Sequence, residues 1–279
     1  MSGAAAPAER ARRPLLGADA RRFWNLTWTL AVTDFKLRFY GSVLGYFWTL
    51  ARPFLFFGVI YFVFTGIVGL DKNVPNYGVY ILFALVLFQF FAEATGNCVG
   101  ALVSRESMLR KMRFPRLVIP LAVVLTALFN LGMTLIAVFV FALASGISPT
   151  WSWLELPVII AILTVLALGV GLLLSSLFVR YRDVQPIWDV VSQMLFYASP
   201  VLYVATMVPE SYQRAYLVNP LAALLTEMRH AVVDPGARHA WEAIGEAERL
   251  LIPASIVVVL FVLGLWVFHR EAPRIAENL

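Results

Sequence analysis

The chain has 279 residues, of which 61% are hydrophobic and only 14% are charged. Soluble domains carry about 25% charged residues, so this composition excludes an ordinary water-soluble fold and indicates a polytopic membrane protein. The formal charge of +5 does not indicate nucleic-acid binding, because the basic residues flank apolar runs and do not gather on one polar domain.

The N-terminal part of the chain divides into two segments. Residues 1–20 are rich in Ala, Pro and Arg and predict a disordered cytoplasmic N-terminus. In residues 21–42 aromatic side chains such as Trp24 and Trp28 stand among charges. This mixture is typical of an amphipathic helix that lies in the membrane interface, although a poorly ordered lead-in to the first span would give the same pattern.

Six apolar runs follow, and a membrane-spanning helix needs about 20 mostly apolar residues. The predicted spans are residues 44–70, 77–103, 117–146, 156–179, 184–207 and 250–268. We therefore predict an all-α transmembrane domain over residues 43–270 with six transmembrane helices, followed by a cytoplasmic tail at 271–279.

The region at 199–249, between the fifth and sixth predicted spans, is not an ordinary loop. It holds four prolines and two short apolar pieces, Val201–Val208 and Tyr216–Leu225. Each piece is too short to span, so they predict re-entrant or interfacial helices on the outer side. A folded extracellular loop is the alternative.

The basic residues indicate the orientation of the chain. With six spans both termini share one side, and 16 of the 22 Lys and Arg residues fall on that side against five on the other. The positive-inside rule therefore predicts that both termini are cytoplasmic.

The sequence carries no pattern of an enzyme or a metal centre. A G-x-x-x-x-G-K-[ST] loop is absent, so ATP is not expected to bind here by a P-loop. The histidines His230, His239 and His269 form no H-E-x-x-H pattern, and a metal site is not expected. We predict no catalytic residue and no cofactor bound by this chain.

One acid lies deep inside a predicted span. Glu93, Gly96, Asn97 and Gly100 share one face of a helix. An acid at this depth is costly and should face protein or water. The face could line a transport pathway, or Gly96 and Gly100 could allow close helix packing. Asn130, in the next span, predicts a hydrogen bond between helices.

Several short motifs resemble a known family. The stretch Asp34–Phe64 contains Asp34, Lys36, Arg38, Ser42, Leu44, Gly45, Trp48 and Pro53 in the order found at the start of ABC-2-type transporter permeases of the polysaccharide and teichoic-acid export branch. Further matches are Lys111 with Phe114-Pro115-Arg116, then RYRDV at 180–184, SPVLY at 199–203 and NPL at 219–221. Met112 and Arg113 depart from the family pattern.

This resemblance implies a half-transporter that forms a homodimer in the bacterial cytoplasmic membrane and binds two copies of a separate ABC ATPase, which would hold ATP and Mg²⁺. It also implies an ATPase-coupling helix in the loop after the second span. The candidate coupling residues are Ser104, Arg105, Glu106, Met108, Leu109, Arg110, Lys111 and Arg113.

The implied substrate is a lipid-linked glycan such as O-antigen or teichoic acid. The resemblance and the need of an anion for cationic partners make Lys36, Arg38 and Arg52 candidates for receiving a pyrophosphate headgroup at a cytoplasmic gate. Positive-inside anchoring would explain the same charges, and Arg52 could also extend toward the cytoplasmic interface. Three other functions stay open: an ABC-2 exporter of a drug or lipid, a membrane-embedded enzyme of lipid-linked sugar metabolism, and a structural scaffold.

Overall fold

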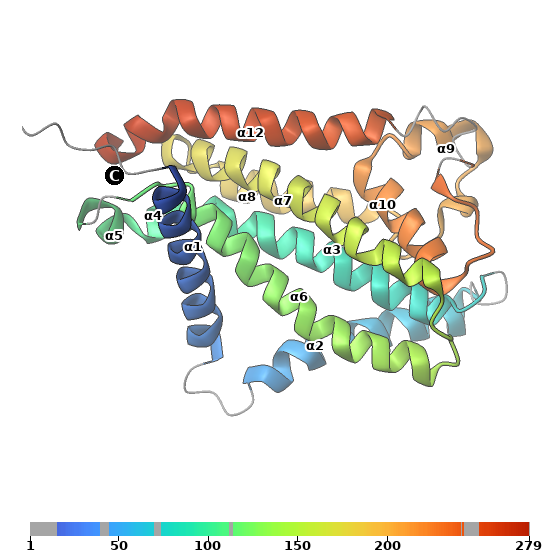
Figure 1. The fold of residues 1–279 in the computed structure, drawn as a ribbon. Helices are drawn as coiled ribbons and strands as arrows, with labels where there is room; N and C mark the ends of the chain where they lie inside the picture. Colours follow the sequence, from blue (N-terminus) through green and yellow to red (C-terminus); the bar gives the residue numbers. More distant parts are fainter. Residues whose placement is uncertain are drawn as a thin grey trace, which may run out of the picture.

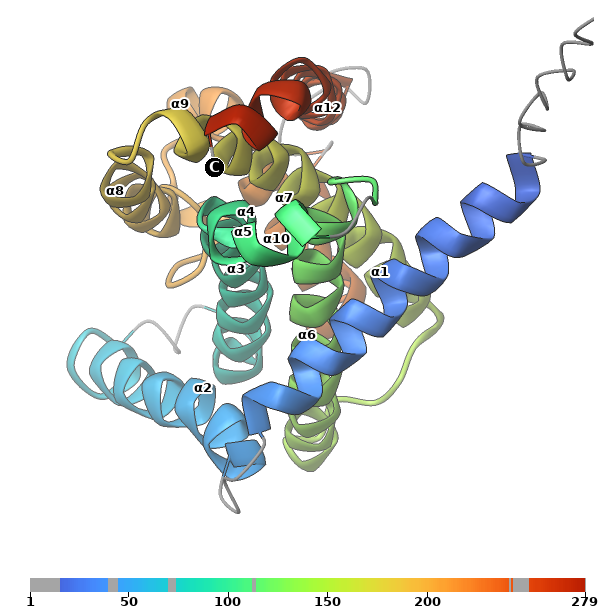
Figure 2. The same ribbon diagram turned by 90° about the vertical axis from the view of Figure 1, so that its left-hand side faces the viewer.

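The structure, a computed structural model, describes residues 16–39, 45–69, 74–111, 114–240, 242 and 251–278. Every regular element in this described part is helical, which confirms the all-α class. The long helices lie side by side in a bundle, and helix α1 (Leu16–Phe39) runs crosswise over one end of it (Figures 1 and 2).

Five helices of the described chain are long and apolar enough to cross a membrane. They are α2 (Gly45–Tyr61) with its π-helical continuation η1 (Phe62–Ile67), α3 (Tyr77–Val99), α6 (Val118–Ala144), α7 (Glu155–Arg180) with the preceding 3₁₀ turn η3 (Trp151–Leu154), and α12 (Leu251–Asn278). These helices correspond to the first four and the last of the predicted spans.

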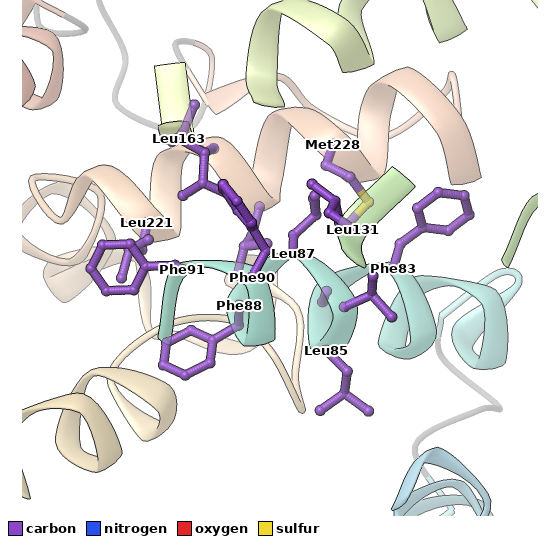
Figure 3. Close-up of a cluster of buried hydrophobic side chains, with 14 of the residues drawn as sticks. Phe83, Leu85, Leu87, Phe88, Phe90, Phe91, Leu131, Leu163, Leu221 and Met228 are labelled. Carbon is purple, nitrogen blue, oxygen red and sulfur yellow. The ribbon is translucent and has the colours of Figure 1, made fainter. Parts of the chain in front are cut away.

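Helix α3 forms the centre of the bundle. It packs against α2, α6, α7 and α8 (Val184–Tyr197), and most of its side chains are buried. A helix that is apolar on all sides is stable only when protein or lipid surrounds it. Figure 3 shows the resulting core, in which Phe83, Leu87 and Phe91 of α3 lie beside Leu131 of α6 and Leu163 of α7.

The fifth predicted span is only partly helical. Helix α8 covers 14 residues, about 21 Å at 1.5 Å per residue, which is shorter than a hydrocarbon core of about 30 Å. Helix α8 ends before Ser199-Pro200, and proline disfavours helical geometry at the residue before it. The count of six spans therefore stays a prediction.

The region after α8 contains short helices, as expected, but not at the expected positions. Val201–Val208 holds only the 3₁₀ turn η4 (Ala205–Met207), and it is followed by α9 (Glu210–Tyr216), α10 (Pro220–Met228) and the π-helical η5 (Arg229–Val233). The Asn219 side chain accepts a hydrogen bond from the Leu221 backbone N–H at 3.0 Å and caps α10.

Three side chains at or just before the start of α3 form hydrogen bonds with the region after α8. The hydroxyl of Tyr77 donates to the Leu202 carbonyl at 2.6 Å, Tyr80 donates to the Pro200 carbonyl, and the Asn76 amide donates to the Val233 carbonyl at 3.2 Å. These bonds satisfy backbone carbonyls of irregular segments. They therefore fix the short helices against one end of the bundle.

The elements predicted to be at or near the cytoplasmic side lie together at the opposite end of the bundle. Helix α1, the short helices α4 (Ala101–Ser104) and α5 (Glu106–Lys111), and the C-terminal end of α12 lie there together (Figures 1 and 2). Two boundaries differ from expectation: α1 begins at Leu16, inside the segment 1–20, and α12 continues to Asn278, through most of the predicted tail.

Helices α7 and α12 approach each other closely, and two glycines make this contact possible. A Cβ on Gly264 would lie 2.3 Å from the carbonyl oxygen of Gly169, and a Cβ on Gly169 would lie 2.7 Å from the Cα of Phe261. Small residues let membrane helices approach this closely. By contrast, a Cβ on Gly96 would meet nothing within 4 Å.

We predict that Gly264→Ala lowers the free energy of unfolding by about 1–3 kcal/mol, because the new methyl group must push backbone atoms apart. The matched control is Gly96→Ala, which adds the same methyl group where there is room. SDS titration of the purified chain in mixed micelles measures both. Equal stability of the two variants would contradict the tight α7–α12 contact.

Candidate functional site

A cavity of about 710 Å³ lies between α1, α2, α3 and α6. Polar side chains make up much of its wall, in a bundle that is otherwise strongly apolar. Those that line it are Arg38 from α1, Thr49 and Arg52 from α2, Gln89, Glu93 and Asn97 from α3, and Asn130 and Thr134 from α6. The indole of Trp48 also lines it.

The carboxylate of Glu93 joins three helices at this cavity. Its Oε1 atom forms an ion pair with Nη1 of Arg38 on α1 and accepts a hydrogen bond from Nδ2 of Asn130 on α6 at 2.7 Å. An acid inside a membrane bundle requires such partners, because lipid cannot solvate it. The predicted interhelical hydrogen bond of Asn130 is thus confirmed, and Glu93 both bonds to its neighbours and lines the cavity.

Arg38 is well placed for this contact. It lies in the last turn of α1, where a cation interacts favourably with the negative end of the helix dipole. Its side chain is 40% exposed and that of Glu93 is 27% exposed. Ion pairs with this exposure are worth no more than about 1 kcal/mol in water, so this contact can be exchanged for another anion.

Arg52 supplies a second positive charge to the same cavity. Its side chain is exposed, and none of the ion pairs and hydrogen bonds found in the described chain involves it. The cavity therefore holds two guanidinium groups and one carboxylate. This surplus of positive charge favours an anionic ligand.

Asn130 adds a polar group with unused bonding capacity. The residue is 4% exposed, and its Oδ1 atom is buried without a hydrogen-bond partner among the described residues. Leaving a buried acceptor unsatisfied costs about 1–3 kcal/mol. Because this oxygen is enclosed by protein atoms, the amide of Asn130 contributes to the site through its hydrogen bond to Glu93.

The structure separates the remaining candidates from this site. Lys36 is exposed on α1 and does not line the cavity. Gly96 and Gly100 also stay outside its wall, and Gly100 lies at the junction of α3 and α4. Arg38, Arg52, Glu93 and Asn97 are thus the predicted residues that the fold brings together.

The candidate coupling residues form the turn and short helix around α5. Leu109 packs against the core, Met108 and Glu106 are half-buried, and Ser104 is exposed. Arg110 and Lys111 belong to α5, but their side chains and the whole of Arg113 lie outside the described residues. The predicted helix in this loop is present, and α5 lies at the same end of the bundle as α1 (Figure 2).

A second ion pair connects α1 to this loop. Nη2 of Arg105, in the turn between α4 and α5, contacts Oδ2 of Asp34 on α1, and both side chains are about one-quarter exposed or less. Burial raises the pKa of the Asp34 carboxyl, while the guanidinium groups of Arg105 and Arg38 act in the opposite direction. The pair fixes the start of α5 to α1.

Sequence reasoning missed this pair and part of the cavity wall. Asp34 entered only as one residue of a family motif, although its spacing of four residues from Arg38 places both on one face of α1. The sequence did not identify Gln89, Thr49 and Thr134 as cavity residues, because single neutral polar residues are common in membrane helices.

The family model described as ABC-2 type transporter matches residues 25–233, about three-quarters of the chain. The chain therefore belongs to the ABC-2 type transporter family. This family consists of membrane-embedded transporter subunits rather than enzymes.

Named relatives cover almost the whole chain. The O-antigen export system permease protein RfbA of Klebsiella pneumoniae is 29% identical over 88% of this chain and 92% of its own length. The protein of the same name from Myxococcus xanthus is 28% identical over 92% of this chain and 96% of its own length. The polysialic acid transport protein KpsM of Escherichia coli is 22% identical over 87% of this chain and 92% of its own length.

We predict that Arg38 and Glu93 stabilise the fold as a pair. A double-mutant cycle with Arg38→Gln and Glu93→Gln should give a coupling energy of about 0.5–1 kcal/mol, measured by SDS titration in mixed micelles. Arg22→Gln combined with Glu93→Gln is the control cycle and should be additive, because Arg22 is exposed elsewhere on α1. Additivity in both cycles would rule out a working ion pair.

Proposed function

We propose that this chain is the permease subunit of an ATP-driven exporter that moves a lipid-linked polysaccharide across the bacterial cytoplasmic membrane. The single observation that carries the proposal is the cavity at the α1 end of the bundle. Its two guanidinium groups, Arg38 and Arg52, suit the phosphates of a lipid-linked headgroup. The relatives named for O-antigen and polysialic acid export support a glycan as the cargo.

The wall of the cavity suits a sugar next to those phosphates. Asn97 and Gln89 offer amide donors and acceptors, and Trp48 offers a flat apolar surface. In this proposal the headgroup enters at the end where α1 and α5 lie, with both termini on the cytoplasmic side, and the glycan leaves near α9 and α10.

The energy comes from a separate ABC ATPase, of which two copies bind the assembled transporter and carry the ATP and Mg²⁺. Helix α5 is the proposed docking element, because it is a short helix between α4 and α6 at the end of the bundle that is proposed to face the cytoplasm. A docked partner can change the conformation of the permease only through its differential affinity for two states. ATP binding and hydrolysis in the partner would supply that difference.

The complete transporter contains a second copy of this chain. The surface of α8 supports a homodimer. Asp189 and Gln193 are exposed on this helix, and so are apolar residues such as Val190 and Met194. An acid that faces lipid is costly, so a second copy that covers this helix would shield Asp189. Membrane lipids would surround the remaining apolar faces.

We predict that Ser107→Trp abolishes docking of the ATPase. Ser107 is exposed on α5, and an indole there would block a close-fitting partner. Co-purification of the full chain with the ABC ATPase that binds the wild-type chain measures docking. The matched control is Ser211→Trp on α9, at the other end of the bundle, which should leave docking unchanged. Normal docking of Ser107→Trp, or failure of any ABC ATPase to bind the wild-type chain, would refute this part of the proposal.

A further inference from the structure

Helix α1 carries two charged residues that contact two different parts of the protein. Asp34 and Arg38 are four residues apart and therefore lie on one face of the helix. Asp34 pairs with Arg105, in the turn that begins α5, and Arg38 pairs with Glu93 in the cavity wall. One helical turn of α1 thus connects the proposed docking element with the cavity.

Aromatic contacts hold α1 against α6 near this turn. The rings of Trp28 and Phe35 pack edge-on against Phe129 of α6, with centroids 5.3 Å and 5.8 Å away. The Thr126 hydroxyl of α6 donates to the Ala122 carbonyl of its own helix at 2.8 Å and also lies 3.3 Å from the Ala31 carbonyl of α1. Figure 2 shows α1 crossing α6. Since α1 is one continuous helix, a displacement at Asp34 also moves Arg38.

The two ion pairs differ in exposure. The side chains of Arg105 and Asp34 are 20% and 25% exposed, whereas those of Arg38 and Glu93 are 40% and 27% exposed. Solvent weakens the more exposed pair more strongly. The pair at α5 is therefore the firmer connection, and the pair at the cavity is the one that exchanges more readily.

We propose that Asp34 and Arg105 are positioning residues that hold α1 so that Arg38 covers Glu93 and restricts access to the cavity. A displacement of α5 moves α1 through the Asp34–Arg105 pair and separates Arg38 from Glu93. The use of this connection in transport rests on the proposed function. In transport, a phosphate-bearing headgroup would take the place of Glu93 beside Arg38. By thermodynamic linkage, binding of the headgroup would then change the position of α5.

The test measures access to the cavity in the full chain alone, in nanodiscs of phosphatidylethanolamine and phosphatidylglycerol. The chain's one cysteine, Cys98, is replaced by alanine, and Thr49→Cys puts a thiol in the cavity wall. The rate at which a water-soluble maleimide modifies this thiol reports how open the cavity is. Arg38→Gln should raise the rate by at least about fivefold.

Asp34→Asn and Arg105→Gln, neither of which touches the cavity wall, should raise the rate in the same direction. Asp34→Glu, which keeps a carboxylate facing Arg105, should leave the rate within about twofold of the parent, whereas a merely structural role would make it behave like Asp34→Asn. Arg22→Gln removes a positive charge elsewhere on α1 and should leave the rate unchanged.

The proposal is overturned if Arg38→Gln leaves the rate unchanged, if Asp34→Asn and Arg105→Gln have no effect, or if Asp34→Glu raises the rate as much as Asp34→Asn does. None of these measurements needs an ATPase or a glycan. Failure of the proposed function, seen as loss of docking or of transport, is therefore distinguishable from failure of this connection.

Discussion

Lipid cannot solvate a charge, so an acid in a membrane helix must face protein partners or a water-filled cavity. Glu93 meets this requirement through Arg38 on α1 and Asn130 on α6. One carboxylate thereby sets the relative positions of three helices, and these helices form walls of the cavity. Without Glu93, neither Arg38 nor Asn130 would have its observed partner in the described structure.

The same constraint relates the two ends of the molecule. At the end that holds α9 and α10, Tyr77 and Tyr80 of α3 satisfy carbonyls of the irregular segment after α8. At the other end, Arg105 and Asp34 join the short helices to α1. Helix α3 contributes both to these tyrosine contacts and to the cavity, and its buried position fixes the distance between them. The transport proposal needs such a fixed frame, against which α1 and α5 can move.

The sequence predicted the helical class, the long apolar helices, the crosswise N-terminal helix and Glu93 as the notable acid, because each leaves a strong local signal. It did not predict the partner of Glu93, since Arg38 lies 55 positions away and only packing brings the two together. The sequence also did not predict the α7–α12 contact at Gly169 and Gly264, because only packing brings these glycines together. The spacing of Gly96 and Gly100 allowed close helix packing as a prediction, but neither glycine makes a close helix contact. The position of α10 differed because Asn219 and Pro220 begin the helix later than hydrophobicity alone indicates.

The most direct test of the account is ATP-dependent movement of a fluorescent polyprenyl-diphosphate-linked glycan in proteoliposomes that contain this chain and its ABC ATPase. The account predicts movement by the wild-type pair and a reduction of more than about tenfold when Arg38 and Arg52 are both changed to glutamine, because each removes a charge-assisted contact. Wild-type vesicles that show no ATP-dependent movement, or a double variant as active as the wild type, would contradict it.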